Sequence, residues 1–409
     1  MSAQLTTSRK PSAAMSDLLT DPLILLQQLV AIPSVNPMGL PATGSIYFEG
    51  GVTDWLIRFF QSLNVPYEVQ EVLPGRCNVL ARIDSPEAVR TVMLDAHQDT
   101  VPVDGMVIDP FTPVLKEGRL YGRGSCDVKG GMAAMLAAFA RLAKERPYGS
   151  ANVLMSCTCD EEYAAHGANT VADHWRSQDP SESMFSTPPD VCIVAEPTDL
   201  NVVVAHKGVV RWKLKTTGRA CHSSRPHEGK NAIYQMAELL NLIQQYAAEL
   251  PQLIGSHPLC GVPTLSVGRI TGGTSVNIVP AECDIEIDRR LIPGERPEDV
   301  IPHLTDYLRA RTDLPFEMLD SWVDAPPLSD GNNGESAERL LKCIEQVAGP
   351  REKQGAWYGT NAASFSNAGV PCVVCGPGSI AQAHTADEWI EVEQLHQAAE
   401  IFYQFCLES

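Results

Sequence analysis

The chain has 409 residues, more than one ordinary hydrophobic core accommodates, so we expect two domains. Hydrophobic residues make up 44% of the chain and charged residues 20%, as is typical of a globular protein. A formal net charge of -19 argues against binding to nucleic acid or to an anionic membrane. No segment approaches the ~18 uninterrupted apolar residues of a membrane span. Residues 1–15 are polar and lack the apolar stretch of a signal peptide, so we expect a cytoplasmic protein.

Helix and strand patterns alternate through the first half of the chain. The predicted elements are amphipathic helices over 16–32 and 51–64, strands over 78–83 and 92–96, and an alanine-rich helix over 130–145. This alternation predicts an α/β domain with a mixed, largely parallel sheet and helices on both faces. The polar, proline-rich stretch 177–189 is expected to be a surface loop.

The pattern changes at about Gly208. The predicted order is strand 209–218, helix 231–250, strands 262–270 and 283–291, helix 297–311 and strand 315–322. This β-α-β-β-α-β order is that of a split βαβ, ferredoxin-like unit. We therefore expect residues 208–322 to form a domain inserted into a catalytic domain of residues 1–207 and 323–409. A helix over 336–349 and a strand over 370–376 would complete the catalytic domain.

The twelve cysteines are scattered through apolar, strand-like runs. That distribution favours buried, reduced thiols over a disulfide framework. Cys157 with Cys159, and Cys372 with Cys375, have fragments of zinc-ribbon spacing, but no second pair follows either. We therefore predict a structural role for both pairs.

Five separated stretches carry the imidazole and carboxylate groups that catalytic zinc or a close substitute prefers. The candidates are His97, Asp127, the pair Glu161 and Glu162, Glu196, and His384. A single carboxylate is usually a solvated surface residue, and a single histidine is usually structural. Several of these acids follow apolar runs, however, where an unpaired charge would be costly. Together the five stretches predict one metal site at the carboxyl ends of parallel strands.

The strand ends refine this prediction. His97 and Asp99 are two residues apart, so on a strand they share a face, and Asp99 can hold the far ring nitrogen of His97. The alternative is an ordinary polar strand end. The acids 160–162 follow another apolar run, and their mutual repulsion indicates a cation or raised pKa values. Neighbouring strand residues face opposite ways, so one glutamate can bind metal while the other addresses a water molecule.

Six motifs together carry a family resemblance. They are HxDxVP from His97, GRGxxDxKGG around Asp127, DEE at 160–162, AEP ending at Pro197, HSSxPxxGxNAI from His222, and GPGSIxQAHxxDE around His384. From about Pro33 to the C-terminus the chain resembles the zinc-dependent family of acetylornithine deacetylases, succinyl-diaminopimelate desuccinylases, aminoacylases and related carboxypeptidases. The ending most resembles that of the acetylornithine deacetylases.

The resemblance implies a metal-dependent exopeptidase-like fold with two divalent metal ions, zinc or alternatively cobalt or manganese. By the same resemblance, His97 and Glu196 would complete one metal site, Glu162 and His384 the other, and Asp127 would bridge them. It also implies a cis peptide bond between Asp127 and Val128, although the family often has methionine at the second position.

The resemblance further implies catalytic and substrate-binding roles. Glu161 would be the general base, and His222 and Asn277 of the inserted domain would stabilise the developing oxyanion. Arg290 would bind a substrate carboxylate, with a surface ion pair as the alternative. Gly378 would permit close approach of the substrate.

The expected function is metal-dependent hydrolysis of the amide bond of an N-acyl amino acid, with N2-acetylornithine, a substrate of arginine biosynthesis, as the leading candidate. Alternatives are desuccinylation of N-succinyl-diaminopimelate, an aminoacylase or a dipeptidase. An inactive homologue with a binding role is a further alternative, against which the presence of Glu161 and all five ligand stretches argues. The family resemblance also implies a homodimer formed through the inserted domain. Asn361 stands where the family commonly has an acid, which leaves recognition of the substrate amine open.

Overall fold

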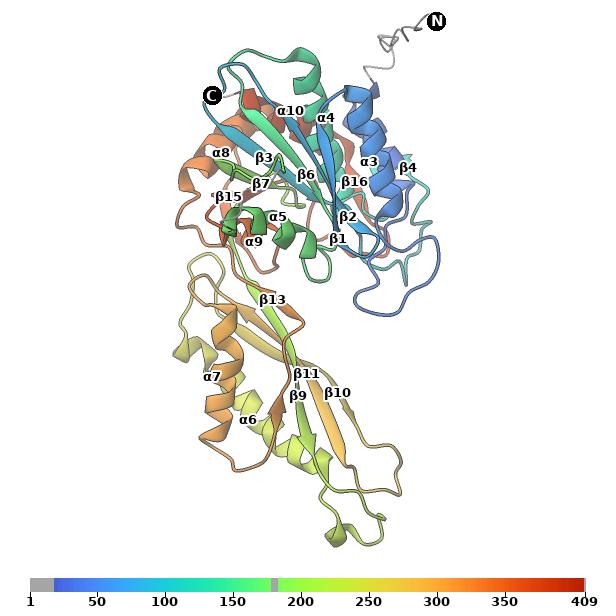
Figure 1. Ribbon diagram of the computed structural model, residues 1–409, viewed down its shortest axis with the longest axis vertical. Helices are drawn as coiled ribbons and strands as arrows, with labels where there is room; N and C mark the ends of the chain where they lie inside the picture. The colour runs from blue at the N-terminus through green and yellow to red at the C-terminus, as the bar shows by residue number, and fades with distance from the viewer. Residues whose placement is uncertain (1–17, 178–182, 408–409) are drawn as a thin grey trace, which may run out of the picture.

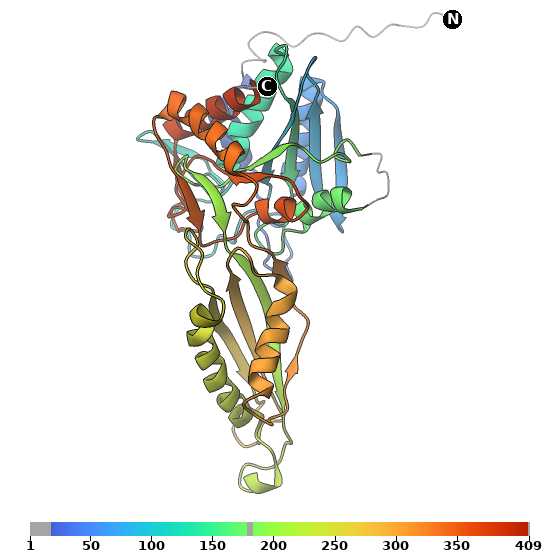
Figure 2. The same ribbon diagram turned by 90° about the vertical axis from the view of Figure 1, so that its left-hand side faces the viewer.

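The computed structural model describes residues 18–177 and 183–407. Residues 1–15 and part of the expected loop 177–189 lie outside these ranges. Figures 1 and 2 show two bodies stacked along the long axis of the molecule, one built on a broad sheet and the other on a narrow one.

The broad sheet has eight strands in the described chain, in the order β1-β2-β6-β3-β7-β15-β8-β14. The central strands β6, β3, β7 and β15 run parallel, whereas β2 is antiparallel to β6 and to β1, and β8 is antiparallel to β15. The strands are β1 (Tyr67–Leu73), β2 (Arg76–Ile83), β3 (Thr91–His97), β6 (Asn152–Thr158), β7 (Val191–Val194), β8 (Val202–His206), β14 (Lys353–Ala356) and β15 (Cys372–Val374). The predicted mixed, largely parallel sheet is confirmed.

Helices cover both faces of this sheet, as predicted (Figure 1). One face carries α2 (Pro22–Val30), α3 (Gly50–Leu63), α4 (Lys129–Glu145), α8 (Gly334–Ala348) and α10 (Val392–Leu407). The other carries α5 (His166–Arg176) and α9 (Ala362–Ser366). The alanine-rich α4 is buried on nearly all sides because it packs between the sheet, α2 and α10. A small sheet of β16 (Trp389–Glu391), β5 (Arg119–Tyr121) and β4 (Val114–Lys116) lies beside this layer.

The helix predicted over 16–32 is interrupted. Residues 16 and 17 lie outside the described ranges, Leu18 is helical, a turn follows at residues 19–20, and α2 begins at Pro22. Asp21 caps it by accepting hydrogen bonds from the N–H groups of Leu23 and Ile24. Proline fits the first helical position because its missing N–H would have no intrahelical partner there.

The narrow sheet follows the predicted β-α-β-β-α-β order. Its elements are β9 (Gly208–Thr217), α6 (Ala232–Leu253), β10 (Thr264–Gly272), β11 (Glu282–Leu291), α7 (Pro297–Arg309) and β12 (Glu317–Met318). The strand order is β10-β11-β9-β12, and α6 and α7 bury their apolar sides on one face of the sheet (Figure 2). This leaves the opposite face with alternating charged side chains.

The last predicted strand, 315–322, is much shorter in the structure. β12 has two residues, after which the chain bulges and pairs with β9 again through β13 (Val323–Ala325). The N–H groups of Leu319 and Trp322 still donate to β9, so the interruption is the two residues between them, Asp320 and Ser321. Both residue types favour turns over strands. The narrow sheet therefore reaches Ala325.

All twelve cysteines fall within the described ranges, and none forms a disulfide bond. Among them only Cys77 and Cys221 are partly exposed, so the prediction of mostly buried thiols outside any disulfide framework is confirmed. Along the described chain, no helix combines the length and the apolar character needed to cross a membrane.

Candidate metal centre

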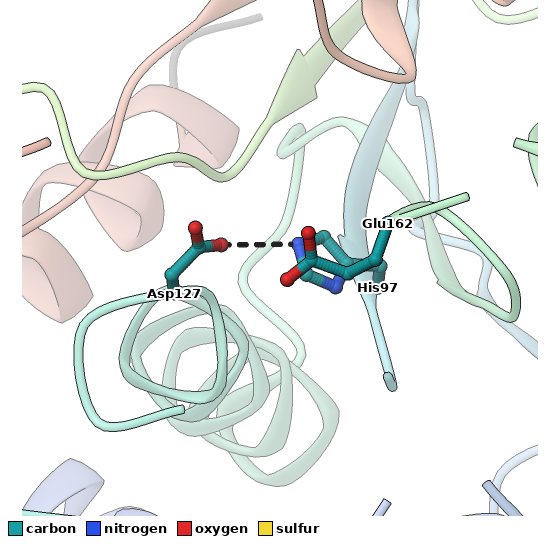
Figure 3. A group of neighbouring side chains, drawn as sticks. All are labelled: His97, Asp127 and Glu162. Atoms are coloured by element: carbon teal, nitrogen blue, oxygen red, sulfur yellow. Dashed lines mark ion pairs between the residues drawn. The ribbon is translucent and has the colours of Figure 1, made fainter. Parts of the chain in front are cut away.

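The predicted metal ligands gather at one edge of the broad sheet. His97 ends β3, Glu162 follows β6 and Glu196 follows β7, and these three strands are parallel neighbours. Their carboxyl ends therefore meet at the same edge. Asp127 arrives from the turn before α4, and His384 from the loop before β16. Figure 3 shows Asp127 facing the imidazole of His97, with Glu162 beside that ring.

Asp127 lies between the two histidines. Its Oδ1 is 3.3 Å from Nε2 of His97, and its Oδ2 is 3.2 Å from Nε2 of His384. Glu162 Oε2 is 3.4 Å from the same nitrogen of His384. The peptide bond between Asp127 and Val128 is cis, as the family resemblance implied. The two oxygens of the Asp127 carboxylate thus face two different imidazoles, which is the arrangement that a bridging ligand needs.

The donor set fits a divalent cation. One ligand atom each from His97, Asp127 and Glu162 lie within 4.8 Å of one another. Glu162 Oε1 is buried without a hydrogen-bond partner among the described residues. Buried carboxylate oxygens are costly unless a positive charge or a donor compensates them. Imidazole nitrogen and carboxylate oxygen together suit zinc and its neighbours among the transition metals.

Burial and mutual repulsion raise the pKa values of three glutamates around this centre. Burial raises the pKa of Glu161 to about 8, with His97 opposing the shift and the nearby carboxylates adding to it. Burial and the charge of Asp127 raise the pKa of Glu162 to about 7. Glu196 is only 5% exposed, and burial followed by repulsion from Asp127 and Glu161 raises its pKa as well. These mutual effects place Glu196 in the same cluster.

Asp127 behaves in the opposite way. Burial alone would raise its pKa, but the contacts with His384 and His97 outweigh burial and lower the pKa below its ordinary value. Asp127 therefore stays a carboxylate, as a ligand must.

Asp99 contacts His97, as expected, but through its main-chain oxygen more closely than through its carboxylate. His97 Nδ1 lies 2.9 Å from the main-chain oxygen of Asp99 and 3.6 Å from its carboxylate. β3 ends at His97, so the side chain of Asp99 is no longer bound to the strand alternation. Its carboxylate instead accepts the N–H groups of Glu161 and Glu162, each at 3.1 Å, and Asn36 Nδ2 at 2.8 Å. Asp99 thus orients both glutamates.

Sequence reasoning missed Glu388, which is fully buried behind Asp127. Its carboxylate accepts the N–H groups of Cys126 and Asp127 at 2.8 and 2.9 Å and pairs with Arg123 at 2.8 Å. It thereby fixes the turn that presents Asp127. The available signal was an acid directly before the apolar run of β16.

A second polar cluster that sequence reasoning missed supports the other side of the centre. Arg76 is buried between Glu49 and Asp160, and its Nη1 is 2.5 Å from Asp160 Oδ1. Asn36 Nδ2 joins Asp160 to Asp99 at 3.0 and 2.8 Å. The segment 160–162 is therefore held from both of its ends.

Asn361 is the residue before α9, packs against the ends of β3 and β6, and is 1% exposed. Its Nδ2 donates to Asp95 Oδ2 at 3.0 Å and to Thr158 Oγ1 at 2.9 Å. Both donor hydrogens of the amide are thus used by the protein itself.

His222 and Asn277 lie together but away from this cluster. His222 forms a bridge with Ile278, and Ser223 N donates to the carbonyl of Asn277 at 3.0 Å. The segments that carry them follow β9 and join β10 to β11, at the end of the narrow body farthest from the broad sheet (Figure 1). A single chain does not bring them to the metal ligands.

Arg290 forms an ion pair with Asp288, which is the alternative role considered for it from the sequence. Its Nε is 2.7 Å from Asp288 Oδ1, and both side chains project from the charged face of β11. Gly378 has φ +87°, and a Cβ atom there would lie 2.7 Å from Cys126 Sγ. The glycine therefore allows the loop carrying His384 to pack against the turn carrying Asp127.

Comparisons with known proteins agree with this geometry. The model of peptidase family M20/M25/M40 matches residues 93–408. The chain is 32% identical to acetylornithine deacetylase from Pasteurella multocida, over 82% of this chain and 87% of the relative. It is 31% identical to acetylornithine deacetylase from Aliivibrio salmonicida, over 89% of this chain and 92% of the relative. An M20 family metallo-carboxypeptidase from Sulfolobus solfataricus has the same fold, with a TM-score of 0.74 at 19% identity over 94% of this chain and 98% of that chain. The chain therefore belongs to peptidase family M20/M25/M40, and it is a metal-dependent hydrolase of amide bonds.

Proposed function

We propose that the protein is an N-acyl amino-acid deacylase that converts N2-acetylornithine to ornithine and acetate. The observation that carries the proposal is the placement of Asp127 between His97 and His384, with Glu161 Oε2 4.0 Å from His97 Nε2. The names of the curated relatives support the acetylated substrate.

His97 and Glu196 would hold one divalent ion and Glu162 and His384 a second, with Asp127 between the two. Bound divalent ions supply Lewis acidity, which polarises the scissile carbonyl and makes water a stronger acid. Zinc is the proposed ion, and cobalt and manganese accept the same donor set.

Glu161 moves the proton. Water adds to the acetyl carbonyl carbon, and Glu161 accepts the proton that this water loses. When the bond between carbon and nitrogen breaks, Glu161 gives this proton to the leaving amine. Asp99 orients Glu161 through the main-chain N–H. Because the main chain positions Glu161, its carboxylate oxygens remain available to accept a hydrogen bond from the attacking water.

The inserted domain supports a homodimer as part of this function. β10 is an edge strand with a largely exposed surface, and exposed apolar side chains gather around the end that carries His222: Tyr234, Val276 and Ile278. We infer that this end reaches the metal centre of the partner subunit, where His222 and Asn277 would stabilise the oxyanion. Arg290 would bind the α-carboxylate of the substrate after leaving Asp288.

The cations near the expected site loops support an acetyl rather than a succinyl group. Lys207 Nζ donates to the carbonyl of Val262 at 2.7 Å, Arg225 pairs with Glu228 at 2.6 Å, and Arg290 would already be occupied by the α-carboxylate of the substrate. A succinyl group would need a cation for its second carboxylate. The twelve cysteines, none of which forms a disulfide bond, support the proposed cytoplasmic location, where arginine biosynthesis would use the reaction.

An activity panel tests the proposal. We expect kcat/KM to be highest for N2-acetylornithine among acetylated and succinylated amino acids and dipeptides. A preference for N-succinyl-diaminopimelate or for dipeptides would overturn the substrate and leave amide hydrolysis standing. Absence of turnover of every member by the metal-loaded protein would favour an inactive, binding homologue.

A further inference from the structure

A small cavity lies beside the metal centre, and none of the predicted site residues lines it. It has a volume of about 210 Å³. Its wall is formed by Pro197, Thr198, Asp199 and Asn201 after β7, by residues 354–358, and by Ile380. Pro197 directly follows the ligand Glu196, and Ile380 belongs to the loop that carries His384. The cavity is thus built from the same segments as the metal centre.

The cavity is smaller than the roughly 300–1,000 Å³ of a site that encloses a whole small molecule. It suits one side chain of a substrate whose amide lies at the metal ligands. Tyr358 connects the two places: burial raises the pKa of its hydroxyl, and the charges of Glu196 and Asp127 add to this effect. Tyr358 also lines the cavity.

Asp199 is the only charged residue among the described residues that line this cavity. Among the described residues, the cation that contacts Asp199 is Arg351, and it binds the main chain and not the carboxylate: its Nε donates to the main-chain oxygen of Asp199 at 3.1 Å, and its Nη1 donates to two further carbonyls. The carboxylate is therefore available to a ligand.

Hydrogen bonds hold the main chain of the turn that carries Asp199. The N–H of Asp199 donates to the carbonyl of Gly378 at 2.7 Å, and that of Leu200 to the carbonyl of Gly376 at 3.1 Å. Thr198 Oγ1 accepts the N–H of Gly376 at 3.1 Å. A main chain that is already held limits the conformational freedom that is lost when the Asp199 side chain binds a ligand, which favours affinity.

An aromatic side chain completes the cavity. Trp357 is 68% exposed although it is large and apolar. Tyr358 packs edge-on against it, with 5.4 Å between the ring centroids, a spacing within the range of roughly 4.5–7 Å that aromatic pairs prefer. An indole face attracts a positive charge and packs well against methylene groups. An apolar wall with one acid is the complement of an alkyl chain that ends in an ammonium group.

We propose that this cavity binds the side chain of the substrate and that Asp199 is the counter-ion of its terminal ammonium group. The inference rests on the proposed deacylase function and deepens it, because it names the residue that selects a cationic amino acid. It also explains why a succinylated diaminopimelate would bind poorly: that side chain ends in a carboxylate as well as an ammonium, and the carboxylate would face Asp199.

The test compares two side chains of equal length, one charged and one neutral. The substrates are N2-acetylornithine and N-acetylnorleucine, and the variants are Asp199→Asn and, as a matched loss of one exposed acid elsewhere, Asp313→Asn. We expect Asp199→Asn to lower kcat/KM for acetylornithine about tenfold or more, mainly through KM, and to change that for acetylnorleucine less than about twofold. Asp313→Asn should change neither. Equal effects of Asp199→Asn on both substrates would overturn the proposal.

Binding of the products separates this inference from the proposed function. Ornithine and norleucine are not consumed, so calorimetry measures their affinity for the wild-type protein and for folded Asp199→Asn, whatever the enzyme hydrolyses. We expect only ornithine to bind about tenfold more weakly to the variant. Equal ornithine affinity for both proteins would overturn the cavity assignment even if acetylornithine were the best substrate. Loss of ornithine affinity in the variant of a protein that hydrolyses no acetylornithine would support the cavity and refute acetylornithine as the substrate.

Discussion

The carboxylate of Asp99 accepts the main-chain N–H group of Glu161 at 3.1 Å. The side chain of Asp99 therefore positions the residue proposed as general base, while the main-chain oxygen of Asp99 holds the ring of His97. Residue 99 thus couples the orientation of a metal ligand to that of the base.

Replacing Asp99 should separate these two effects. Asp99→Ala keeps the carbonyl that holds His97 but removes the acceptor for Glu161 and Glu162. We expect activity to fall about 10- to 100-fold, the usual cost of removing a group that supports metal ligands. Asp99→Asn, which retains one acceptor oxygen, should lose less. If both variants matched the wild type in kcat and metal content, Asp99 would have no positioning role.

Replacing Glu161 should remove proton transfer and leave the ligands in place. Glu161→Gln is expected to keep two metal ions per chain and to lower turnover by roughly 10²- to 10⁴-fold. Glu162→Gln is the matched control, because it should lower metal content together with activity. Elemental analysis and steady-state kinetics on the same preparations measure both. Loss of metal in Glu161→Gln, with residual rate in proportion to the metal retained, would reverse the two assignments.

Metal removal should destabilise the protein as well as inactivate it. Two divalent ions per chain would neutralise Asp127, Glu162 and Glu196, which otherwise repel one another in a buried site. A chelator should abolish activity and lower the melting temperature, and added zinc should restore both. An unchanged melting temperature after complete metal removal would contradict the electrostatic argument.

The metal-free protein should lose stability as the pH rises from about 5 to 8. Burial and like charges raise the folded-state pKa of Glu161 from 4.5 to about 8 and that of Glu162 to about 7. The folded state then binds more protons than the unfolded state in this window, so raising the pH favours unfolding. His384, whose pKa is raised from 6.5 to about 11, adds in the same direction above pH 6.5. Melting curves over this range measure the slope, which should flatten when metal is bound.

Subunit mixing tests whether His222 acts on the partner. His222→Ala and Glu161→Ala should each be inactive alone. In a hybrid dimer, one metal centre keeps Glu161 and receives an intact His222 from the other chain. With random exchange, half of the dimers are hybrids with one working site, so about a quarter of wild-type activity should return. No recovery after exchange has been demonstrated would exclude this role.

Much of the molecule was determined by local sequence. The apolar runs at 78–83 and 92–96 form buried strands because continuous apolar residues suit a sheet covered on both faces. The acids and histidines after those runs could be recognised as ligands because parallel strands bring their carboxyl ends to one edge. The inserted β-α-β-β-α-β unit followed from a change in hydrophobic period that needs no long-range information.

The tertiary structure decided what depends on contacts between distant segments. Glu388 reaches the N–H of Asp127 across 261 positions of sequence, and nothing in its local pattern shows that contact. The carboxylate of Asp99 turns from His97 to the segment after β6 because β3 has ended and the N–H groups there have no partner in the sheet. His222 lies far from the metal ligands of its own chain because the inserted sheet extends away from the broad one. Asp199 lines a cavity only because three separate segments meet around it. Helices and strands can be predicted from local sequence because they depend on residues that are neighbours in the chain. The site cannot, because it forms only when the ends of separate helices and strands are brought together by packing.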